Sequence, residues 1–385
     1  MVRFTVLASG SKGNATVVNG GRTLILVDCG LSCKELFRRM RLMDEEPETL
    51  DAILITHEHS DHVGGLAVTA RKLKIPVYFT EGTHRAWMRW LSPRRQMSYA
   101  QWMEQTRKQA AERQAEAVAA TEEGEADESD LAETAEAAEP DKPAEPTERI
   151  PAKEPTWLPA VEYFAAGEAF EIGDIRISPF TTPHDAADPV GFVFGAEGVR
   201  MGFVTDLGYI SPNVKAQLKD LDLLLLESNH DLEMLRDGPY PWSVKQRVMS
   251  RVGHLSNEAA ASFLEDDYDG QAAYVILAHL SESNNLPELA RVTAERALNG
   301  RASLLANMLL LAAQNEPLSS LYFEVMYVTM VRQGNHSVPG RLARETPGHS
   351  ALEDAEQIGR RKRILPGRLS IWFFCSLGHV RRAIP

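Results

Sequence analysis

Residues 57 to 62 read His57-Glu58-His59-Ser60-Asp61-His62, directly after the apolar run Ile53-Leu54-Ile55. The apolar run and Thr56 predict a short, buried strand of a parallel sheet, so the histidines begin where the chain leaves that sheet. In an extended or tightly turning segment His57 and His59 point the same way and can chelate one ion, while Asp61 and His62 face a second site. Imidazole nitrogen and carboxylate oxygen suit zinc, with manganese or iron as alternatives.

Other metal-type residues also end strand-like runs. His184 ends a run from Ile177, Asp206 ends a run from Met201, and His279 ends a run from Tyr274. In open α/β sheets ligands collect at strand ends, so the repetition is more informative than any one residue. The alternative, that the histidine-rich loop is only a solvated turn, leaves this repetition unexplained.

The segment from Thr56 to His62, followed in order by His184, Asp206 and His279, resembles the metallo-β-lactamase fold. The resemblance implies an α/β chain with four-layer αββα architecture, two mixed sheets face to face with helices outside and two metals at one edge. It further implies that one metal is held by His57, His59 and His184, that the other is held by Asp61, His62 and His279, and that Asp206 bridges both.

Four further segments together resemble the WalJ (YycJ) group of phosphodiesterases, which is related to ribonuclease Z and to PhnP-type phosphodiesterases. They are Ser9 to Asn14, Pro183 to Gly191, Glu227 to Asp231 and Gly253 to Asn257. The resemblance spans about residues 2 to 91 and 157 to 300. It implies hydrolysis of nucleic-acid phosphodiesters, with DNA as the substrate and a 5′ to 3′ exonuclease activity.

The expected chemistry suits a phosphodiester. Two metals about 3.5 to 4 Å apart can lower the pKa of a bridging water, orient the resulting hydroxide for in-line attack and stabilise the leaving oxygen. Asp61 can help to orient that water. His254 lies where ribonuclease Z has a Gly-His-Ser segment paired with an acid, which here would be Glu227, and such a pair favours the imidazolium of a general acid. The alternative for His254 is a helix-capping or surface histidine.

Candidate substrate contacts lie in several loops. The turn from Ser9 to Asn14 can be a plain hairpin turn, but it can also hold a phosphate through its amides and Lys12. Beside the metal motif we favour the second interpretation. For His230 structural and functional roles are equally supported. The candidate contacts are Ser11, Lys12, Asn14, His230, Ser256 and Asn257.

A further segment combines aromatic and basic residues. Tyr240-Pro241-Trp242-Ser243 is followed by Lys245, Arg247 and Arg251. Such residues can stack on bases and neutralise phosphates, or they can form a packed lid. The sequence supports both interpretations equally.

Charge and composition divide the chain. Its 385 residues carry a net charge of −13, and residues 102 to 155 alone hold 16 acidic and 6 basic residues, a balance of −10. We therefore expect one catalytic domain from residues 1–91 and 157–323, and a disordered, Ala/Glu/Pro-rich insertion at 92–156. Residues 324–385 are a basic tail without a clear period, interpreted as a solvated run or an extension without a defined fold.

No stretch predicts a membrane span or a signal peptide. The longest apolar stretch, Leu304 to Ala313, is too short for a span and predicts a buried helix. The three cysteines, at positions 29, 33 and 375, argue against a disulfide scaffold. We expect a cytoplasmic enzyme with nucleic acid as its partner and no membrane contact.

Periodicity predicts the remaining elements. Residues Ser32 to Glu35 form a capping-box pattern that opens a helix with Leu36, Phe37 and Met40 on one face. Strands are predicted at 2–8, 15–18, 23–28, 52–56, 76–79, 175–180, 190–194, 200–205, 221–226 and 273–278. Helices are predicted at 32–42, 64–73, 84–91, 211–219, 242–251, 257–266 and 287–298.

Three functions agree with these features. The first is a dinuclear metal-dependent nuclease that degrades DNA from one end. The second is a phosphodiesterase for small molecules or cyclic nucleotides, or an RNA-processing nuclease, which a short closed pocket would favour. The third is a non-catalytic metal-binding protein, against which the complete ligand set and the retained His254 and Glu227 argue.

Overall fold

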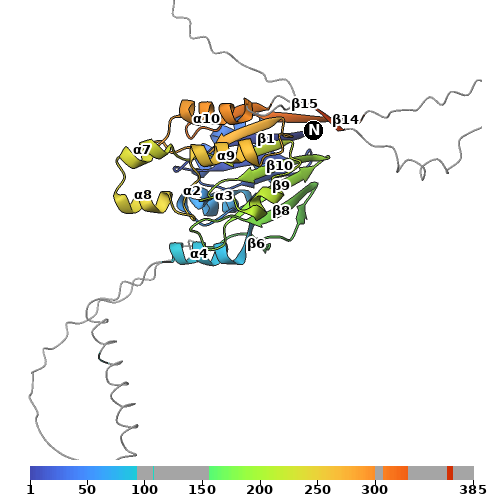
Figure 1. Cartoon of the computed structure of the whole chain (residues 1–385). Coiled ribbons are helices and arrows are strands. Elements are labelled where there is room, and N and C mark those ends of the chain that lie inside the picture. Colours follow the sequence, from blue (N-terminus) through green and yellow to red (C-terminus); the bar gives the residue numbers. More distant parts are fainter. Residues whose placement is uncertain (93–106, 108–155, 300–306, 328–361, 367–385) are drawn as a thin grey trace, which may run out of the picture. The chain divides into compact units, whose positions relative to one another are not determined.

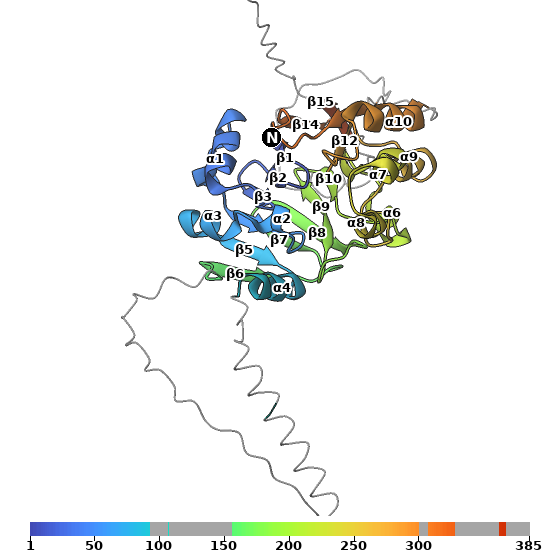
Figure 2. The ribbon, with the colours of Figure 1, turned by 90° about the vertical axis from the view of Figure 1, so that its left-hand side faces the viewer.

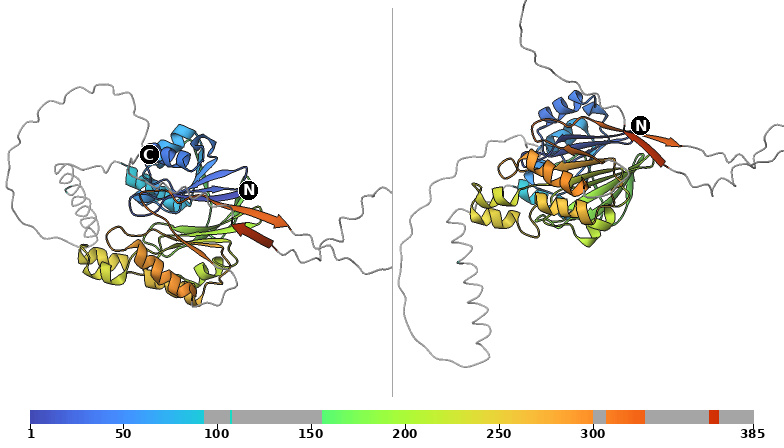
Figure 3. Two further views of the ribbon diagram at one scale, coloured as in Figure 1. Left: turned by 90° about the horizontal axis from the view of Figure 1, so that it is seen from above. Right: turned by 45° about the horizontal axis from the view of Figure 1, so that its top comes forward.

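A computed structural model describes residues 1–92, 107, 156–299, 307–327 and 362–366 of the chain (Figure 1). Two mixed β-sheets lie face to face, and helices cover the outer side of each sheet, as Figure 3 shows, where blue strands belong to the first sheet and most green strands to the second. This is the αββα architecture predicted from the sequence. Nearly all of the predicted acidic insertion and most of the basic tail lie outside the described residues.

The first sheet has eight strands. Its strands β3 to β6 are parallel, and the pairs of β1 with β2 and β14, of β2 with β3, and of β14 with β15 are antiparallel. In spatial order the strands are β15 (Lys362–Pro366), β14 (Leu321–Tyr327), β1 (Val2–Ala8), β2 (Ala15–Asn19), β3 (Leu24–Val27), β4 (Ala52–Leu54), β5 (Pro76–Phe79) and β6 (Ala160–Tyr163).

The second sheet has seven strands. Strands β10 to β13 are parallel, and strands β7 to β10 are antiparallel. In spatial order they are β13 (Met308–Leu311), β12 (Tyr274–Ala278), β11 (Leu223–Glu227), β10 (Val199–Val204), β9 (Val190–Ala196), β8 (Ile175–Thr181) and β7 (Phe170–Ile172).

The core between the two sheets is made of side chains that alternate along their strands. Phe4 and Val27 of the first sheet belong to the same buried cluster as Phe192, Phe203 and Ile276 of the second. Burial of such side chains is the main favourable contribution to folding. A second buried cluster joins the outer face of the second sheet to its helices.

Four helices, α1, α6, α7 and α9, begin at a Ser or Asp whose side chain accepts a hydrogen bond from a backbone N–H of the first turn. Ser32 accepts a hydrogen bond from the backbone N–H of Glu35, and Leu36, Phe37 and Met40 are buried, which confirms the predicted capping and buried face. The helices and the short η1 turn are α1 (Cys33–Leu42), η1 (Pro47–Thr49), α2 (Ser60–Val63), α3 (Leu66–Leu73), α4 (Glu81–Leu91), α6 (Pro212–Gln217), α7 (Leu232–Asp237), α8 (Trp242–Val248), α9 (Asn257–Asp266) and α10 (Pro287–Asn299).

None of the helices within the described ranges has the length and hydrophobicity that crossing a bilayer requires.

The predicted helix over Leu304 to Ala313 is wrong. Residues 308–311 form β13, which pairs in parallel with β12, with Tyr274 opposite Met308. The preceding residues 300–306 lie outside the described part of the chain. Short apolar runs occur both in strands and in buried helices. Here the run pairs with the edge of β12 and is therefore a strand.

The expected boundary at residue 323 also falls inside a strand. β14 continues to Tyr327, and residues 362–366 of the basic tail add β15 at its edge. Sequence analysis also missed the short strands β6 and β7 and the short helices α2 and α7, because three to six residues are too few for a clear period.

Candidate metal centre

The predicted metal residues meet at one edge of the two sheets. They follow β4, β8, β10 and β12, whose carboxyl ends point the same way within each sheet, and Figure 2 looks onto this edge, where α2 lies between the blue and green strands. Asp206 and His279 have φ angles of 60° and 57°. Such left-handed backbone is uncommon for residues other than glycine and concentrates at functional sites.

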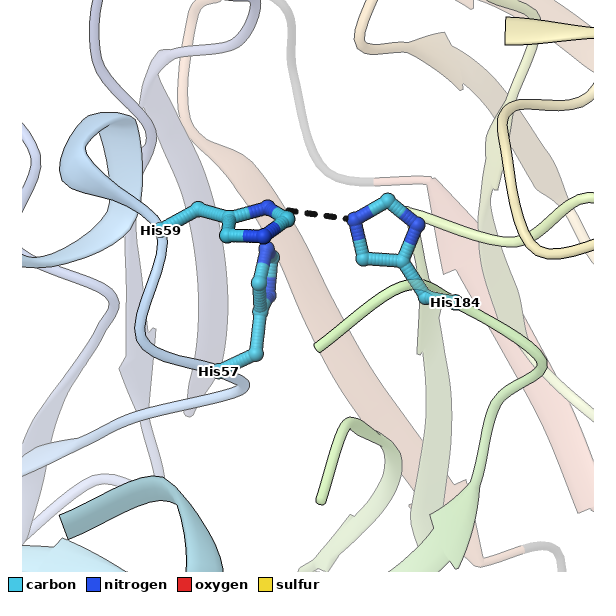
Figure 4. Close-up of side chains that lie close together, drawn as sticks. All are labelled: His57, His59 and His184. Carbon is cyan, nitrogen blue, oxygen red and sulfur yellow. Dashed lines mark hydrogen bonds between the residues drawn. The ribbon is translucent and has the colours of Figure 1, made fainter. Parts of the chain in front are cut away.

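The first group consists of His57, His59 and His184, which approach one another from two loops (Figure 4). The Nδ1 of His59 lies 3.2 Å from the Nε2 of His184. Two nitrogens bound to one zinc at about 2.1 Å, in tetrahedral geometry, are separated by about 3.4 Å. The Nε2 of His57 is buried and has no hydrogen-bond partner among the described residues. These three donors therefore fit a metal ion.

The second group consists of Asp61, His62 and His279. The Oδ2 of Asp61 lies 3.5 Å from the Nε2 of His62 and 3.4 Å from the Nε2 of His279. These atoms have the type and spacing of a second set of ligands, and all ligand atoms of the group lie within 4.8 Å of one another.

Asp206 lies between the two groups. Its Oδ1 is 3.9 Å from the Nε2 of His184 and 3.5 Å from that of His279, and its Oδ2 is 3.4 Å from the Nε2 of His62. Oδ2 is buried and has no hydrogen-bond partner in the described part of the chain. A buried, unpartnered carboxylate oxygen is costly unless a cation compensates it, so the carboxylate fits a position between two ions.

The far side of three of the imidazoles, those of His57, His184 and His279, is held by the protein. Nδ1 of His57 lies 3.0 Å from Oγ1 of Thr56, and Nδ1 of His184 lies 3.0 Å from the carbonyl oxygen of Gly253. Nδ1 of His279 lies 3.3 Å from a carboxylate oxygen of Glu227. Such hydrogen bonds select the tautomer and leave Nε2 free to bind a metal.

Asp28 is a site residue that the sequence interpretation missed. Its Oδ2 lies 2.8 Å from Nδ1 of His62, and its Oδ1 accepts hydrogen bonds from the backbone N–H and the hydroxyl of Thr56. Asp28 follows β3, the parallel neighbour of β4. The strand-end argument that identified Asp206 therefore applied to Asp28 too and could have found it.

The charges of the centre favour cations. Burial alone would lower the pKa of His62, but the carboxylates of Asp28, Asp206 and Asp61 raise it well above its ordinary value. The same interactions keep Asp61 and Asp206 ionised, because neighbouring imidazoles lower the pKa of both against the effect of burial. Burial and the charge of His62 lower the pKa of His57, which favours its neutral, metal-binding form.

The centre fits tightly against the neighbouring loop. A Cβ built on Gly30 would lie 1.7 Å from the backbone oxygen of Asp61, and the backbone N–H of Asn14 donates to that same oxygen at 2.7 Å. Only glycine permits so close a backbone approach.

His254 and Glu227 form a pair beside the metal residues. Nδ1 of His254 lies 2.7 Å from Oε1 of Glu227, and Oε2 of Glu227 accepts the backbone N–H groups of Leu207 and Leu255. Burial would raise the pKa of Glu227, but the charge of His254 and the hydrogen bonds from His254 and His279 lower it to about 2. Burial would also lower the pKa of His254, and the Glu227 carboxylate raises it.

Asp206, Glu227, His254 and His279 also have ligand-type atoms within 4.8 Å of one another. Both oxygens of Glu227 are already engaged by the Nδ1 atoms and the backbone amides. We therefore assign Glu227 and His254 to a hydrogen-bonded network and not to a third metal position.

The turn from Ser9 to Asn14 reaches the metal residues through one side chain. Nδ2 of Asn14 lies 3.2 Å from Oδ2 of Asp61 and 3.0 Å from Nε2 of His62. Ser11 and Lys12 are exposed on the same turn, and Nζ of Lys12 pairs with Glu282 at 2.5 Å. Of these three predicted contacts, the structure brings only Asn14 against the metal ligands.

The other three candidate contacts lie within the fold. His230 is buried, its Nδ1 has no hydrogen-bond partner within the part of the chain that the structure describes, and burial lowers its pKa to about 4. The hydroxyl of Ser256 caps α9, and the buried amide of Asn257 bonds to Ser228 and Asn285. Because Ser256 and Asn257 are engaged with the protein itself, we do not include them among the proposed substrate contacts.

Comparisons with known proteins place this geometry in a family. The model of the metallo-beta-lactamase superfamily matches residues 8–242. The chain is similar to exodeoxyribonuclease YycJ of Bacillus anthracis, with 33% identity over 77% of this chain and 89% of the relative. It is also similar to exodeoxyribonuclease WalJ of Streptococcus pneumoniae, with 32% identity over 76% of this chain and 86% of the relative.

A solved structure shows the same fold. The metallo-beta-lactamase fold protein YhfI of Bacillus subtilis matches 83% of this chain and 100% of its own, with a TM-score of 0.50 and 14% identity. Together with the family match and the two relatives, these findings confirm the resemblance seen in the metal motif. The chain therefore belongs to the metallo-beta-lactamase superfamily and is a metal-dependent hydrolase.

Proposed function

We propose that the chain is a dinuclear metal-dependent phosphodiesterase that degrades DNA from its 5′ end. One observation carries the proposal, namely the hydrogen-bonded pair of His254 and Glu227 directly beside groups of side chains that could hold metal ions. The two relatives are named exodeoxyribonucleases, which supports DNA as the substrate class. The cytoplasmic location expected from the sequence stays a prediction.

The proposed ligands follow the two groups. His57, His59 and His184 would hold one ion, Asp61, His62 and His279 would hold the other, and Asp206, which lies near both groups, would contribute to both. The donor set favours zinc, with manganese or iron as alternatives. Two such ions, when bound, supply an activated water and stabilise the charge that develops on the phosphate.

The protein's own groups direct the protons. The ionised carboxylate of Asp61 is placed to accept a hydrogen bond from the attacking water. His254 carries its Nδ1 proton toward Glu227, so its Nε2 is available to donate a proton to the departing oxygen. Glu227 retains its charge and holds the imidazolium in place.

A small-molecule phosphodiesterase is the alternative, and it requires a short closed pocket. The Tyr240 to Ser243 segment would have to close that pocket, but the side chain of Trp242 is 64% exposed. An uncovered segment favours a long substrate. An RNA-processing nuclease would use the same chemistry on a substrate with a different sugar, so the test below includes RNA.

The experiment measures hydrolysis of 5′-labelled and 3′-labelled duplex DNA, single-stranded DNA, RNA and bis(p-nitrophenyl) phosphate with zinc or manganese. Wild type is compared with Asp61→Ala, His254→Ala and the remote control Asp174→Asn. Stepwise, metal-dependent loss from the 5′ end of DNA, abolished by the first two substitutions and kept by the third, is the expected result. Hydrolysis of the small diester alone would move the substrate to a small molecule. No turnover by metal-loaded protein would favour a binding function.

A further inference from the structure

Arg247 on α8 is linked through Asp185 to the metal residues. Its Nε forms an ion pair with Oδ2 of Asp185, and its side chain is 61% exposed. The other oxygen of Asp185 lies 3.4 Å from Nε2 of His184 and 4.0 Å from Nε2 of His59. One carboxylate thus separates the guanidinium from two proposed ligands of the first metal.

The electrostatics agree with this position. The hydrogen bond with Asp185 raises the pKa of Arg247, and the charge of Asp61 adds to that effect. The carboxylates of Asp185 and Asp61 therefore both act on Arg247, whose side chain remains in contact with solvent. Among the hydrogen bonds of the described residues, the guanidinium uses only Nε, so its outer edge keeps donors for another acceptor.

The surroundings of Arg247 are open to a long ligand. Val244, one helical turn before Arg247 on α8, is 37% exposed, and Trp242 at the start of the helix is 64% exposed. In Figure 1, α7 and α8 (yellow) lie beyond the strand ends, on the side of α2. Exposed side chains of α8 therefore lie beside the strand ends that carry the proposed metal ligands.

We propose that Arg247 binds the phosphate next to the scissile one, exchanging its contact with Asp185 for that phosphate. The inference rests on the proposed function and deepens it, because it names the residue that recognises a polynucleotide. Asp185 lies between Arg247 and the histidines. The guanidinium is therefore farther from the metal ligands than the scissile phosphate would be, by about the width of the Asp185 carboxylate. Arginine suits this role because its planar fork matches phosphate oxygens.

Arg236 on α7 provides a matched control. It is 63% exposed and also pairs with an aspartate, Asp237, but no contact links it to the metal ligands among the described residues. Arg236→Gln and Arg247→Gln remove the same charge from similarly exposed, similarly paired positions. Arg247→Lys keeps the charge and loses the planar guanidinium that can bind two phosphate oxygens.

The experiment measures kcat and KM for a 5′-labelled single-stranded oligonucleotide at several salt concentrations. We expect Arg247→Gln to raise KM about tenfold and to reduce the slope of log(kcat/KM) against log[salt] by about 0.7, the change for one lost phosphate contact on a single strand. Arg247→Lys should restore the slope and only part of KM. Arg236→Gln should match wild type in both.

Two outcomes would overturn the inference. In one, Arg247→Gln and Arg236→Gln behave alike. In the other, Arg247→Gln lowers kcat at unchanged KM, and does so equally on the oligonucleotide and on bis(p-nitrophenyl) phosphate. Because the small diester has only one phosphate, that result would mean that Arg247 acts only through Asp185. Fluorescence anisotropy of the same oligonucleotide separates this inference from the proposed function. Binding with an Arg247-dependent salt slope but no hydrolysis by wild type would sustain the first and reject the second.

Discussion

Glu227 lies 2.7 Å from Nδ1 of His254 and, through the same oxygen, 3.3 Å from Nδ1 of His279. One buried carboxylate therefore joins the proposed proton donor to a proposed metal ligand. The two imidazole rings are stacked, with their centroids 5.2 Å apart. A change at Glu227 should affect both proton transfer and metal affinity.

Glu227→Gln should shift the pH profile. Burial favours the neutral ring of His254, but Glu227 raises its pKa, so the wild type keeps the acidic form of His254 to a higher pH. Without the carboxylate the pKa of His254 falls, and the basic limb of kcat should move to lower pH. The measurement is kcat against pH on DNA with saturating metal, and an unmoved basic limb would show that His254 does not titrate in that limb.

His254→Ala should distinguish leaving groups. A general acid contributes about 10² to 10⁴-fold when the departing oxygen needs a proton. p-Nitrophenolate leaves without one, so the variant should lose far more activity on DNA than on bis(p-nitrophenyl) phosphate. The measurement is the ratio of kcat for the two substrates, with zinc content determined for both proteins. Equal losses on both substrates would place His254 in metal binding or structure.

Asp28→Asn should weaken metal binding, although Asp28 is not itself a proposed metal ligand. The carboxylate orients His62 through the contact at 2.8 Å, and loss of such a partner commonly reduces metal affinity 10 to 100-fold. Competition with a zinc chelator measures the affinity. Asp174→Asn, in an ion pair with the exposed Arg22, is the control and should retain wild-type affinity.

Cys29 should resist alkylation in the folded protein. Its thiol is buried beside β3, and burial raises its pKa to about 12, so almost no thiolate exists at neutral pH. Iodoacetamide labelling followed by peptide mass spectrometry should detect modified Cys29 only after unfolding in urea. Rapid labelling of the native protein would mean that the loop after β3 opens readily.

The sequence predicted best those site residues that directly follow a recognisable strand. His57 and His184 could each be placed at a strand end because each follows a recognisable apolar strand, although the strands, β4 and β8, lie in different sheets. Glu227 could be paired with His254 only through a resemblance, since 27 residues separate them. The roles of Ser256 and Asn257 depended on which neighbours α9 would meet, which no local pattern contains.

The pairing of β1 with β14 has a consequence for synthesis. Val2 lies opposite Phe323, so the first strand obtains its second neighbour only after about 320 further residues have been made. At roughly 5 to 20 residues per second, one edge of β1 stays unpaired for tens of seconds while the ribosome continues. His279, too, is translated long after His57. The nascent chain is therefore exposed to edge-to-edge aggregation and lacks a complete metal centre until nearly all of the catalytic fold has emerged, which makes it a natural client for chaperones.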